Sequence, residues 1–245
     1  MEEKNDIFLS VVVPAYNEEK DIAASISAID RFFSAKKIIY EILLINDGST
    51  DRTAEIIESL ESSFDGRLRL LNEKLNRGKG HALRSGMLAA AGRYVLFTDV
   101  DLSTPLEEFD KMLPLLESGV DVVIGSRRLK ESKIVVHQPW YRELLGGIFY
   151  KIVFVIFLNG ISDTNCGFKA YTKEAAGLIY SKLTIDRWGF DVEALYIAQK
   201  YNLKIKETPV RWLDDAGSRV SVFLAVFNTL KELWQIKVND WRKKY

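Results

Sequence analysis

The sequence has few of the residues that stabilise proteins through covalent links or bound metals. It contains one cysteine, Cys166, and two histidines among 245 residues. A single cysteine excludes an internal disulfide framework and is typical of a reducing compartment. So few cysteine and histidine side chains also argue against a structural zinc site.

An excess of charge of one sign is also missing. The chain carries 34 basic and 34 acidic side chains, so no overall positive field attracts nucleic acid. We therefore expect no nucleic-acid partner. Any contact with phosphate groups must come from local basic clusters.

Long hydrophobic runs are absent as well. The first residues, Met-Glu-Glu-Lys-Asn-Asp, lack the basic region and apolar run of a signal peptide. The most apolar stretch is 144–161, and its continuous apolar part, 152–158, is far below the roughly 20 residues that span a bilayer. This stretch favours a buried helix or a helix lying in the membrane surface over a transmembrane segment.

The composition is otherwise that of a globular protein, with 47% hydrophobic and 28% charged residues. β-Branched and aliphatic runs alternate with helical spacing through residue 126. The expected strands are 8–13, 40–46, 68–71, 94–98 and 120–124. Two expected helices are 18–34 and 78–91. A third ends near 62 with Thr50 or Asp51 as its cap, and a fourth starts at Thr104. This alternation predicts an α/β fold with a mostly parallel sheet and helices on both faces.

The second half is less regular. It predicts helices over 171–181, 190–201 and 220–238, and one strand or a strand pair over 204–212. No internal repeat or low-complexity linker divides the chain. We expect a catalytic domain over 1–215 and a C-terminal helix over 216–245.

Two carboxylates follow the fourth expected strand, in Asp99-Val100-Asp101. Carboxylates two residues apart at a strand end can share Mg²⁺ or Mn²⁺, whose remaining positions are filled by phosphate oxygens and water. A solvated acidic turn is the alternative interpretation.

Other polar groups follow the first two strands, in Pro14-Ala15-Tyr16-Asn17-Glu18 and Asn46-Asp47-Gly48-Ser49. Ligands of parallel sheets bind at this edge, so Asp47 is a candidate for a ribose hydroxyl or base N–H, and Tyr16 for a base. Ordinary turn and capping chemistry is the alternative. The turn 76–80 is glycine-rich and basic without matching a P-loop, and its N–H groups are candidates for an anion.

Several arginines and one neighbouring serine are candidates for binding phosphate, because the guanidinium group pairs well with phosphate oxygens. They are Arg127, Arg142, Arg187, Ser218 and Arg219. For each arginine in this set, the alternative is an exposed side chain without a binding role.

Together these motifs resemble the family 2 glycosyltransferases with the GT-A fold, from about residue 9 to 238. The motifs at 13–18, 46–51 and 99–101 mark the superfamily. Those at 125–127, 163–169 and 187–193 are similar to the polyprenyl-phosphate hexosyltransferases. The block Arg-Trp-Gly-Phe-Asp-Val-Glu at 187–193 looks most like the dolichyl-phosphate β-glucosyltransferases, with the mannosyltransferase branch second.

The resemblance implies transfer of a hexose, with inversion, from a nucleotide diphosphate sugar to a polyprenyl or dolichyl phosphate. UDP-glucose is the favoured donor. GDP-mannose and a non-lipid acceptor remain alternatives, and a non-catalytic binding protein and a nucleotidyltransferase are less well supported. The implied donor contacts are Pro14, Ala15, Tyr16, Glu18, Asp47, Lys79 and Asp99. The implied catalytic residues are Asp101, Asp191 and Arg127, with Asp99 and Asp101 holding Mg²⁺ or Mn²⁺. The acceptor phosphate is assigned to Arg127, Arg142, Arg187, Ser218 and Arg219.

A lipid acceptor implies contact with a membrane, although the transmembrane helices of some family members are not evident in this sequence. We expect the segments 144–161 and 220–241, with Trp234, Trp241 and the following Arg-Lys-Lys, to lie on the membrane surface. The expected location is peripheral, on the cytoplasmic side of a membrane, and a small membrane-protein partner is an open expectation.

Overall fold

The computed structural model describes residues 7–134, 157–158, 160–213 and 222–245, with the side chains of 222–230 not described. Its main feature is a seven-stranded sheet in the order β3-β2-β1-β4-β7-β5-β8. The strands are β1 (Leu9–Ala15), β2 (Tyr40–Asp47), β3 (Leu68–Glu73), β4 (Tyr94–Thr98), β5 (Val122–Ser126), β7 (Phe168–Thr172) and β8 (Ile205–Pro209). Within this sheet β7 alone is antiparallel to its neighbours, β4 and β5. The expected mostly parallel α/β sheet is therefore confirmed.

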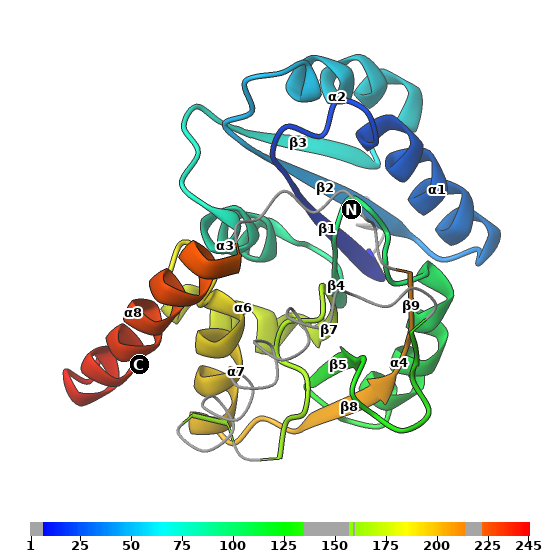
Figure 1. The fold of residues 1–245 in the computed structure, drawn as a ribbon. Helices are drawn as coiled ribbons and strands as arrows, with labels where there is room; N and C mark the ends of the chain where they lie inside the picture. Colours follow the sequence, from blue (N-terminus) through cyan, green and yellow to red (C-terminus); the bar gives the residue numbers. More distant parts are fainter. Residues whose placement is uncertain (1–6, 135–156, 159, 214–221) are drawn as a thin grey trace, which may run out of the picture.

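Helices cover both faces of this sheet (Figure 1). The helices are α1 (Ile22–Ala35), α2 (Thr53–Glu61), α3 (Lys79–Ala89), α4 (Phe109–Glu117), α6 (Lys173–Lys182), α7 (Phe190–Lys200) and α8 (Val222–Trp241). Two short 3-10 helices, Ser62–Phe64 and Leu106–Glu108, precede β3 and α4, and a small parallel sheet pairs β6 (Lys133–Ile134) with β9 (Arg211–Trp212).

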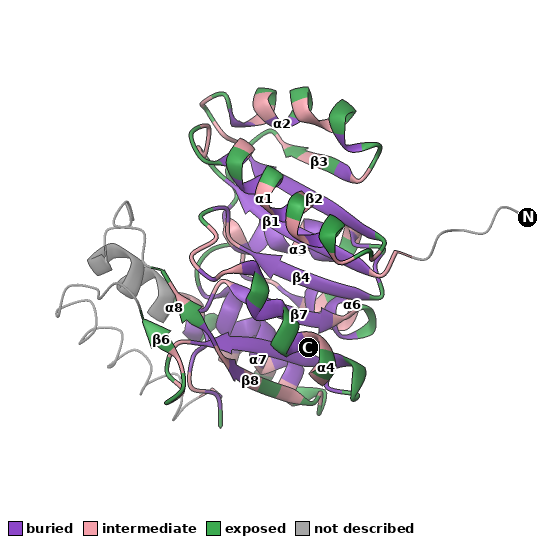
Figure 2. Cartoon of the chain, turned by 90° about the vertical axis from the view of Figure 1, so that its right-hand side faces the viewer, coloured by how far each residue is buried: buried purple, intermediate pink, exposed green. Residues whose placement is uncertain are grey.

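The side chains of each central strand alternate between two hydrophobic cores. In β1, Val12 packs with residues of α3, α6 and α7, whereas Val11 and Val13 pack with residues of α1, α2 and α4. Figure 2 shows β1, β2, β4 and β7 buried along their length. Burial on both faces explains why these strands read as continuous apolar runs rather than as alternating patterns.

One element was assigned incorrectly from the sequence. The helix expected over 171–181 begins at Lys173, and Tyr171 belongs to β7, which inserts between β4 and β5. Thr172 caps this helix, because its Oγ1 accepts a hydrogen bond from the N–H of Ala175 at 3.2 Å. The buried Lys169 in the middle of β7 interrupts the apolar run by which the other strands could be found.

The first helix also begins later than expected, at Ile22 rather than Glu18. Asn17 has a left-handed backbone with φ of 56°, which ends the extended chain of β1 in a turn. Residues 17–19 then hydrogen-bond to the loop after β2. These residues therefore form part of the edge where β1, β2, β4 and β5 end.

No helix among the described residues has the length and apolar character needed to cross a lipid bilayer.

Candidate active site

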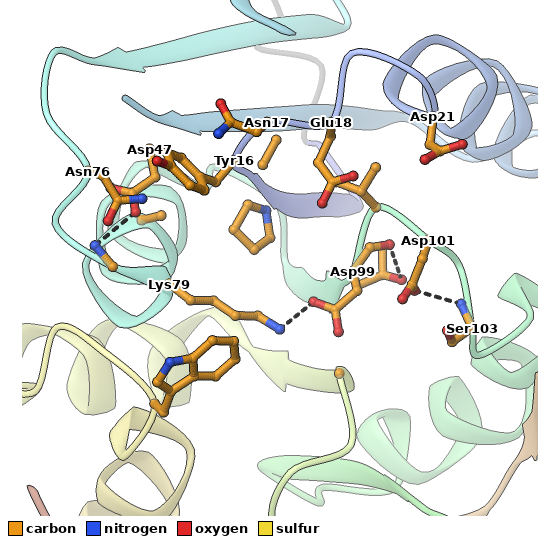
Figure 3. A pocket seen from close by; sticks show the side chains of 18 of the residues that line it. Tyr16, Asn17, Glu18, Asp21, Asp47, Asn76, Lys79, Asp99, Asp101 and Ser103 are labelled. Atoms are coloured by element: carbon orange, nitrogen blue, oxygen red, sulfur yellow. Dashed lines mark hydrogen bonds and ion pairs between the residues drawn. The ribbon is translucent and has the colours of Figure 1, made fainter. Parts of the chain in front are cut away.

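A cleft of about 950 Å³ lies at the carboxyl ends of β1, β2 and β4. Most of the site residues predicted from the sequence line this cleft. They are Pro14, Ala15, Tyr16, Glu18, Asp47, Lys79, Asp99, Asp101, Arg127 and Arg187. Figure 3 shows Asp47 and Lys79 on one side of this space and Asp99 and Asp101 on the other. These residues lie at the sheet edge where ligands of parallel sheets bind, and their roles in binding stay predictions.

The two loops that follow β1 and β2 at the cleft hold each other in place. The N–H of Asn17 donates to Oγ of Ser49 at 2.9 Å, and its side-chain Oδ1 accepts from the N–H of Thr50 at 2.8 Å. The N–H of Glu18 donates to Oγ1 of Thr53 at 2.8 Å. Tyr16 is 44% exposed on this fixed loop, so its ring is available to a ligand without rearrangement of the backbone.

The carboxylate of Asp47 orders the neighbouring glycine-rich turn. Its two oxygens accept hydrogen bonds from the N–H groups of Arg77 at 2.9 Å and Gly78 at 2.8 Å. Gly78 has φ of 116°, and a Cβ there would lie 2.4 Å from the carbonyl oxygen of Asp186, so only glycine fits. Asp47 thereby fixes the start of α3, the helix that carries Lys79.

Lys79 and Asp99 form an ion pair across the floor of the cleft. The Nζ of Lys79 lies 2.6 Å from Oδ1 of Asp99 and 5.2 Å from the centre of the Phe97 ring. Burial alone would lower the pKa of Lys79, but the carboxylates of Asp99 and Asp191 raise it. Lys79 therefore presents a stable positive charge to the cleft.

Asp101 is the exposed member of the carboxylate pair. Its Oδ1 accepts a hydrogen bond from the N–H of Ser103 at 2.9 Å. Burial within the cleft, together with the nearby negative charge of Asp99, raises its pKa. A bound cation would relieve this repulsion between two carboxylates.

The donor set of the pair fits a magnesium-like ion that is completed by the substrate. The described residues contain no group of three or more His, Cys, Asp or Glu able to enclose a metal on its own. Mg²⁺ characteristically takes one or two carboxylates and retains water and phosphate oxygens. Asp99 and Asp101, facing a cleft that is open on the ligand side, match that requirement.

A second ion pair lies beneath the cleft floor, between Lys169 of β7 and Asp191 in the first turn of α7. The Nζ of Lys169 also donates to the carbonyl oxygen of Cys166 at 2.8 Å. Burial raises the pKa of Asp191 even though Lys169 and Lys79 act to lower it. Lys169 was not among the predicted site residues, and the available signal was a lysine between hydrophobic residues of a short strand.

Arg127, predicted to meet the acceptor, is held by Asp163. Its Nε and Nη2 donate to the two carboxylate oxygens of Asp163 at 2.7 and 2.9 Å, and its N–H donates at 3.0 Å. The guanidinium group lies 5.2 Å from the Trp212 ring centre. Burial acts to raise the pKa of Asp163, but Arg127 outweighs it and holds that pKa at about 2. The arginine is thus rigidly oriented on the cleft wall.

The opposite wall, 183–189, is fixed by two partly or fully buried carboxylates. Glu193 of α7 accepts from the N–H groups of Thr184 at 2.9 Å and Ile185 at 2.8 Å, and Glu232 of α8 accepts from that of Gly189 at 2.7 Å. This wall presents Arg187 and Trp188 to the cleft. Trp188, 44% exposed, was not among the predicted site residues.

Three predicted acceptor residues, Arg142, Ser218 and Arg219, lie outside the described residues, as does most of 144–161. The proposed division at residue 215 also falls there. Their roles and the domain boundary stay predictions.

The fold and the cleft together define a glycosyltransferase of the GT-A type. The model of the family described as Glycosyl transferase family 2 matches residues 10–177, and the chain belongs to this family. It is a hexosyltransferase similar to enzymes named dolichyl-phosphate beta-glucosyltransferase. That of Dictyostelium discoideum is 37% identical, with 97% of this chain and 77% of the relative covered. The human one is 32% identical, with 94% and 75% covered.

Solved structures show the same fold at lower identity. Glucosyl-3-phosphoglycerate synthase from Mycobacterium tuberculosis, in complex with Mn²⁺, UDP and phosphoglyceric acid, has a TM-score of 0.66 at 21% identity, covering 94% of this chain and 78% of its own. Mannosyl-3-phosphoglycerate synthase from Rubrobacter xylanophilus has a TM-score of 0.64 at 17% identity, covering 97% and 75%. These similarities concern the fold alone.

Proposed function

We propose that this protein transfers glucose from UDP-glucose to dolichyl phosphate or a related polyprenyl phosphate, with inversion at the anomeric carbon. The observation that carries the proposal is the identity of 31–37% to enzymes named dolichyl-phosphate beta-glucosyltransferase over nearly the whole chain. The cleft supports it by bringing a carboxylate pair, a lysine and two arginines to one sheet edge.

In this proposal the nucleotide lies against the 14–18 loop, with Tyr16 beside the base. Asp47 contributes by holding the turn that carries Lys79. Each oxygen of its carboxylate retains a lone pair that can accept from the ribose or base. Lys79 and the N–H groups at the start of α3 then face the diphosphate.

Asp99 and Asp101 would hold Mg²⁺ or Mn²⁺ at the diphosphate. When bound, the cation offsets negative charge on the departing diphosphate. Lys79 adds a second positive charge at the same place. Charge stabilisation that is fixed before the reaction is the most effective kind, because the site does not have to reorganise as the leaving group departs.

The acceptor phosphate needs little help from a base. Its second pKa is about 6, so its oxygen is largely ionised near neutrality. That oxygen forms a bond to the anomeric carbon while the bond from this carbon to the diphosphate oxygen breaks, and the electron pair leaves with UDP. The site must therefore align the acceptor and bind its charge, which we assign to Arg127, Arg187 and, outside the described residues, Arg142, Ser218 and Arg219.

We assign Asp191 a positioning role rather than proton removal. Asp191 is buried and paired with Lys169. Its negative charge also raises the pKa of Lys79. It thus helps to fix the charge that faces the donor.

A lipid acceptor places the enzyme at a membrane surface, and we propose peripheral attachment on the cytoplasmic side, where nucleotide sugars are available. A small membrane-protein partner stays a prediction. The alternative donor is GDP-mannose.

The test is transfer by the purified full chain, with Mg²⁺ or Mn²⁺, from radiolabelled UDP-glucose and GDP-mannose to a short polyprenyl phosphate. Label from UDP-glucose in the extracted lipid, as a β-linked product, is the expected result. Label from GDP-mannose alone would replace the donor assignment. Donor binding without transfer to the lipid from either nucleotide sugar would overturn the proposed acceptor.

A further inference from the structure

The C-terminal helix α8 (Val222–Trp241) has two faces of opposite character in its described part. Lys231, Trp234, Gln235, Val238, Trp241 and Arg242 lie at helical spacings along one side, which we call the α8 outer face. Trp234 is 73% exposed and Trp241 is 81% exposed. Two large aromatic side chains at this exposure, seven residues apart on one face, form an apolar patch of the kind that marks an interaction surface.

The acidic residues of this part of α8 are turned away from the outer face. Glu232 accepts from the N–H of Gly189 at 2.7 Å, and Asp240 pairs with Lys200 and accepts from the hydroxyl of Tyr196 at 2.8 Å. Basic side chains remain outside: Lys231 and Arg242 on the face, and Lys243 and Lys244 beyond the helix, are exposed. The surface around the two tryptophans is therefore positively charged.

The opposite side of α8 is fixed to the cleft wall. Leu233 and Ile236 are buried in the same core as α7, and Asn239 donates to Oγ1 of Thr184 at 2.8 Å. α8 contacts α7, and Figure 1 shows it extending to the periphery of the molecule. A surface bound to the α8 outer face would therefore also set the orientation of the cleft wall that carries Arg187 and Trp188.

We propose that the α8 outer face docks on the surface of an anionic lipid bilayer through Trp234 and Trp241. Tryptophan concentrates at the level of lipid headgroups, and lysine and arginine are attracted to anionic lipids. The inference rests on the proposed function for its lipid acceptor. It adds that the contact is made by one face of α8, on which both tryptophans are exposed and from which the acidic residues are turned away.

The test measures binding of the full chain to vesicles that contain no polyprenyl phosphate. Phosphatidylcholine vesicles with and without phosphatidylserine are sedimented, and the bound fraction is measured together with tryptophan fluorescence. We expect binding to the anionic vesicles with a blue shift, weakened by high salt through screening. The double variant Trp234→Ser/Trp241→Ser should bind about tenfold more weakly or worse.

A matched control is Ile39→Ser, which removes another exposed apolar side chain, 47% exposed before β2, and should bind as the wild type does. Circular dichroism and thermal unfolding establish that the double variant is folded. Its transfer to a short, water-soluble polyprenyl phosphate should be unchanged, whereas transfer to a long-chain acceptor in vesicles should fall. Equal vesicle binding by the wild type and the double variant would overturn the inference. Because these vesicles lack acceptor, failure of the proposed reaction would leave the binding result intact.

Discussion

The carboxylate of Asp99 lies where a side chain on Gly167 would begin. A Cβ built on Gly167 would be 1.9 Å from Oδ2 of Asp99 and 2.7 Å from its Cγ. The two residues meet because Thr98, at the end of β4, pairs with Phe168, at the start of β7. The antiparallel strand therefore sets the position of the carboxylate that pairs with Lys79.

This contact predicts that Gly167→Ala disrupts donor binding. The methyl group has no room unless Asp99 moves, so we expect the KM for the nucleotide sugar to rise about tenfold or more, since displacements near 1 Å are costly at a reacting centre. Kinetics and thermal unfolding of the variant check this. Gly177→Ala in α6 is the control, because no atom lies within 4 Å of its new Cβ. Unchanged kinetics in Gly167→Ala would contradict the assigned place of Asp99.

Metal removal and Asp101→Asn test the carboxylate pair. A chelator should abolish transfer and Mn²⁺ should restore it, because Asp99 and Asp101 supply the protein's share of the ligands. Asp101→Asn should lower kcat about 10²–10³-fold, the usual cost of losing one preorganised electrostatic contact, and raise the metal concentration needed for half-maximal rate. Asp65→Asn, at an exposed left-handed turn, is the control. Full activity in the chelator would contradict the metal assignment.

The sequence predicted the sheet and most of the cleft for a physical reason. In β1, β2 and β4 burial on both faces demands apolar runs, and polar residues directly after such runs must lie at the ligand edge. Asp47, Asp99 and Asp101 were placed at this edge from their positions directly after a strand, whereas Lys79 was assigned through the family resemblance, and all four line the cleft.

What the sequence did not predict depends on partners distant along the chain. The ligand contact predicted for Asp47 stays a prediction, and the sequence did not indicate that its oxygens also accept from Arg77 and Gly78. Lys169 and Asp191 pair across 22 residues, and no local spacing rule applies to a strand and a helix that meet only in the folded protein. The apolar pattern of β7 was interrupted by the same Lys169.

The pair Lys169–Asp191 predicts a non-additive effect on stability. Lys169→Met leaves the buried carboxylate of Asp191 without its ion-pair partner in β7. We expect it to lower the free energy of unfolding by about 3–5 kcal/mol. The double variant Lys169→Met/Asp191→Asn removes both charges and should recover a large part of that loss. Denaturant unfolding of the two single variants and the double variant measures the coupling.

Activity separates a positioning role from a merely structural one. The double variant should remain folded yet show a lower kcat, with KM changed less, because Asp191 no longer fixes Lys79. Lys169→Arg, which keeps the charge, should restore part of kcat. Wild-type kcat in a folded double variant would show that the pair serves stability alone.

The pair Arg127–Asp163 predicts how stability depends on pH. The pKa of Asp163 is about 2 in the fold, below its unfolded value of about 3.9. Its contribution of about 2–3 kcal/mol is therefore fully present above pH 4 and is lost as the pH falls from about 4 to 2. Asp163→Asn removes this contribution, so the gap in unfolding free energy between wild type and variant should be largest near neutral pH and should narrow below pH 4. Urea unfolding at several pH values measures the gap, with Asp65→Asn as the exposed control. A gap that stays constant from pH 7 to pH 3 would mean that the ion pair with Arg127 does not control the titration of Asp163.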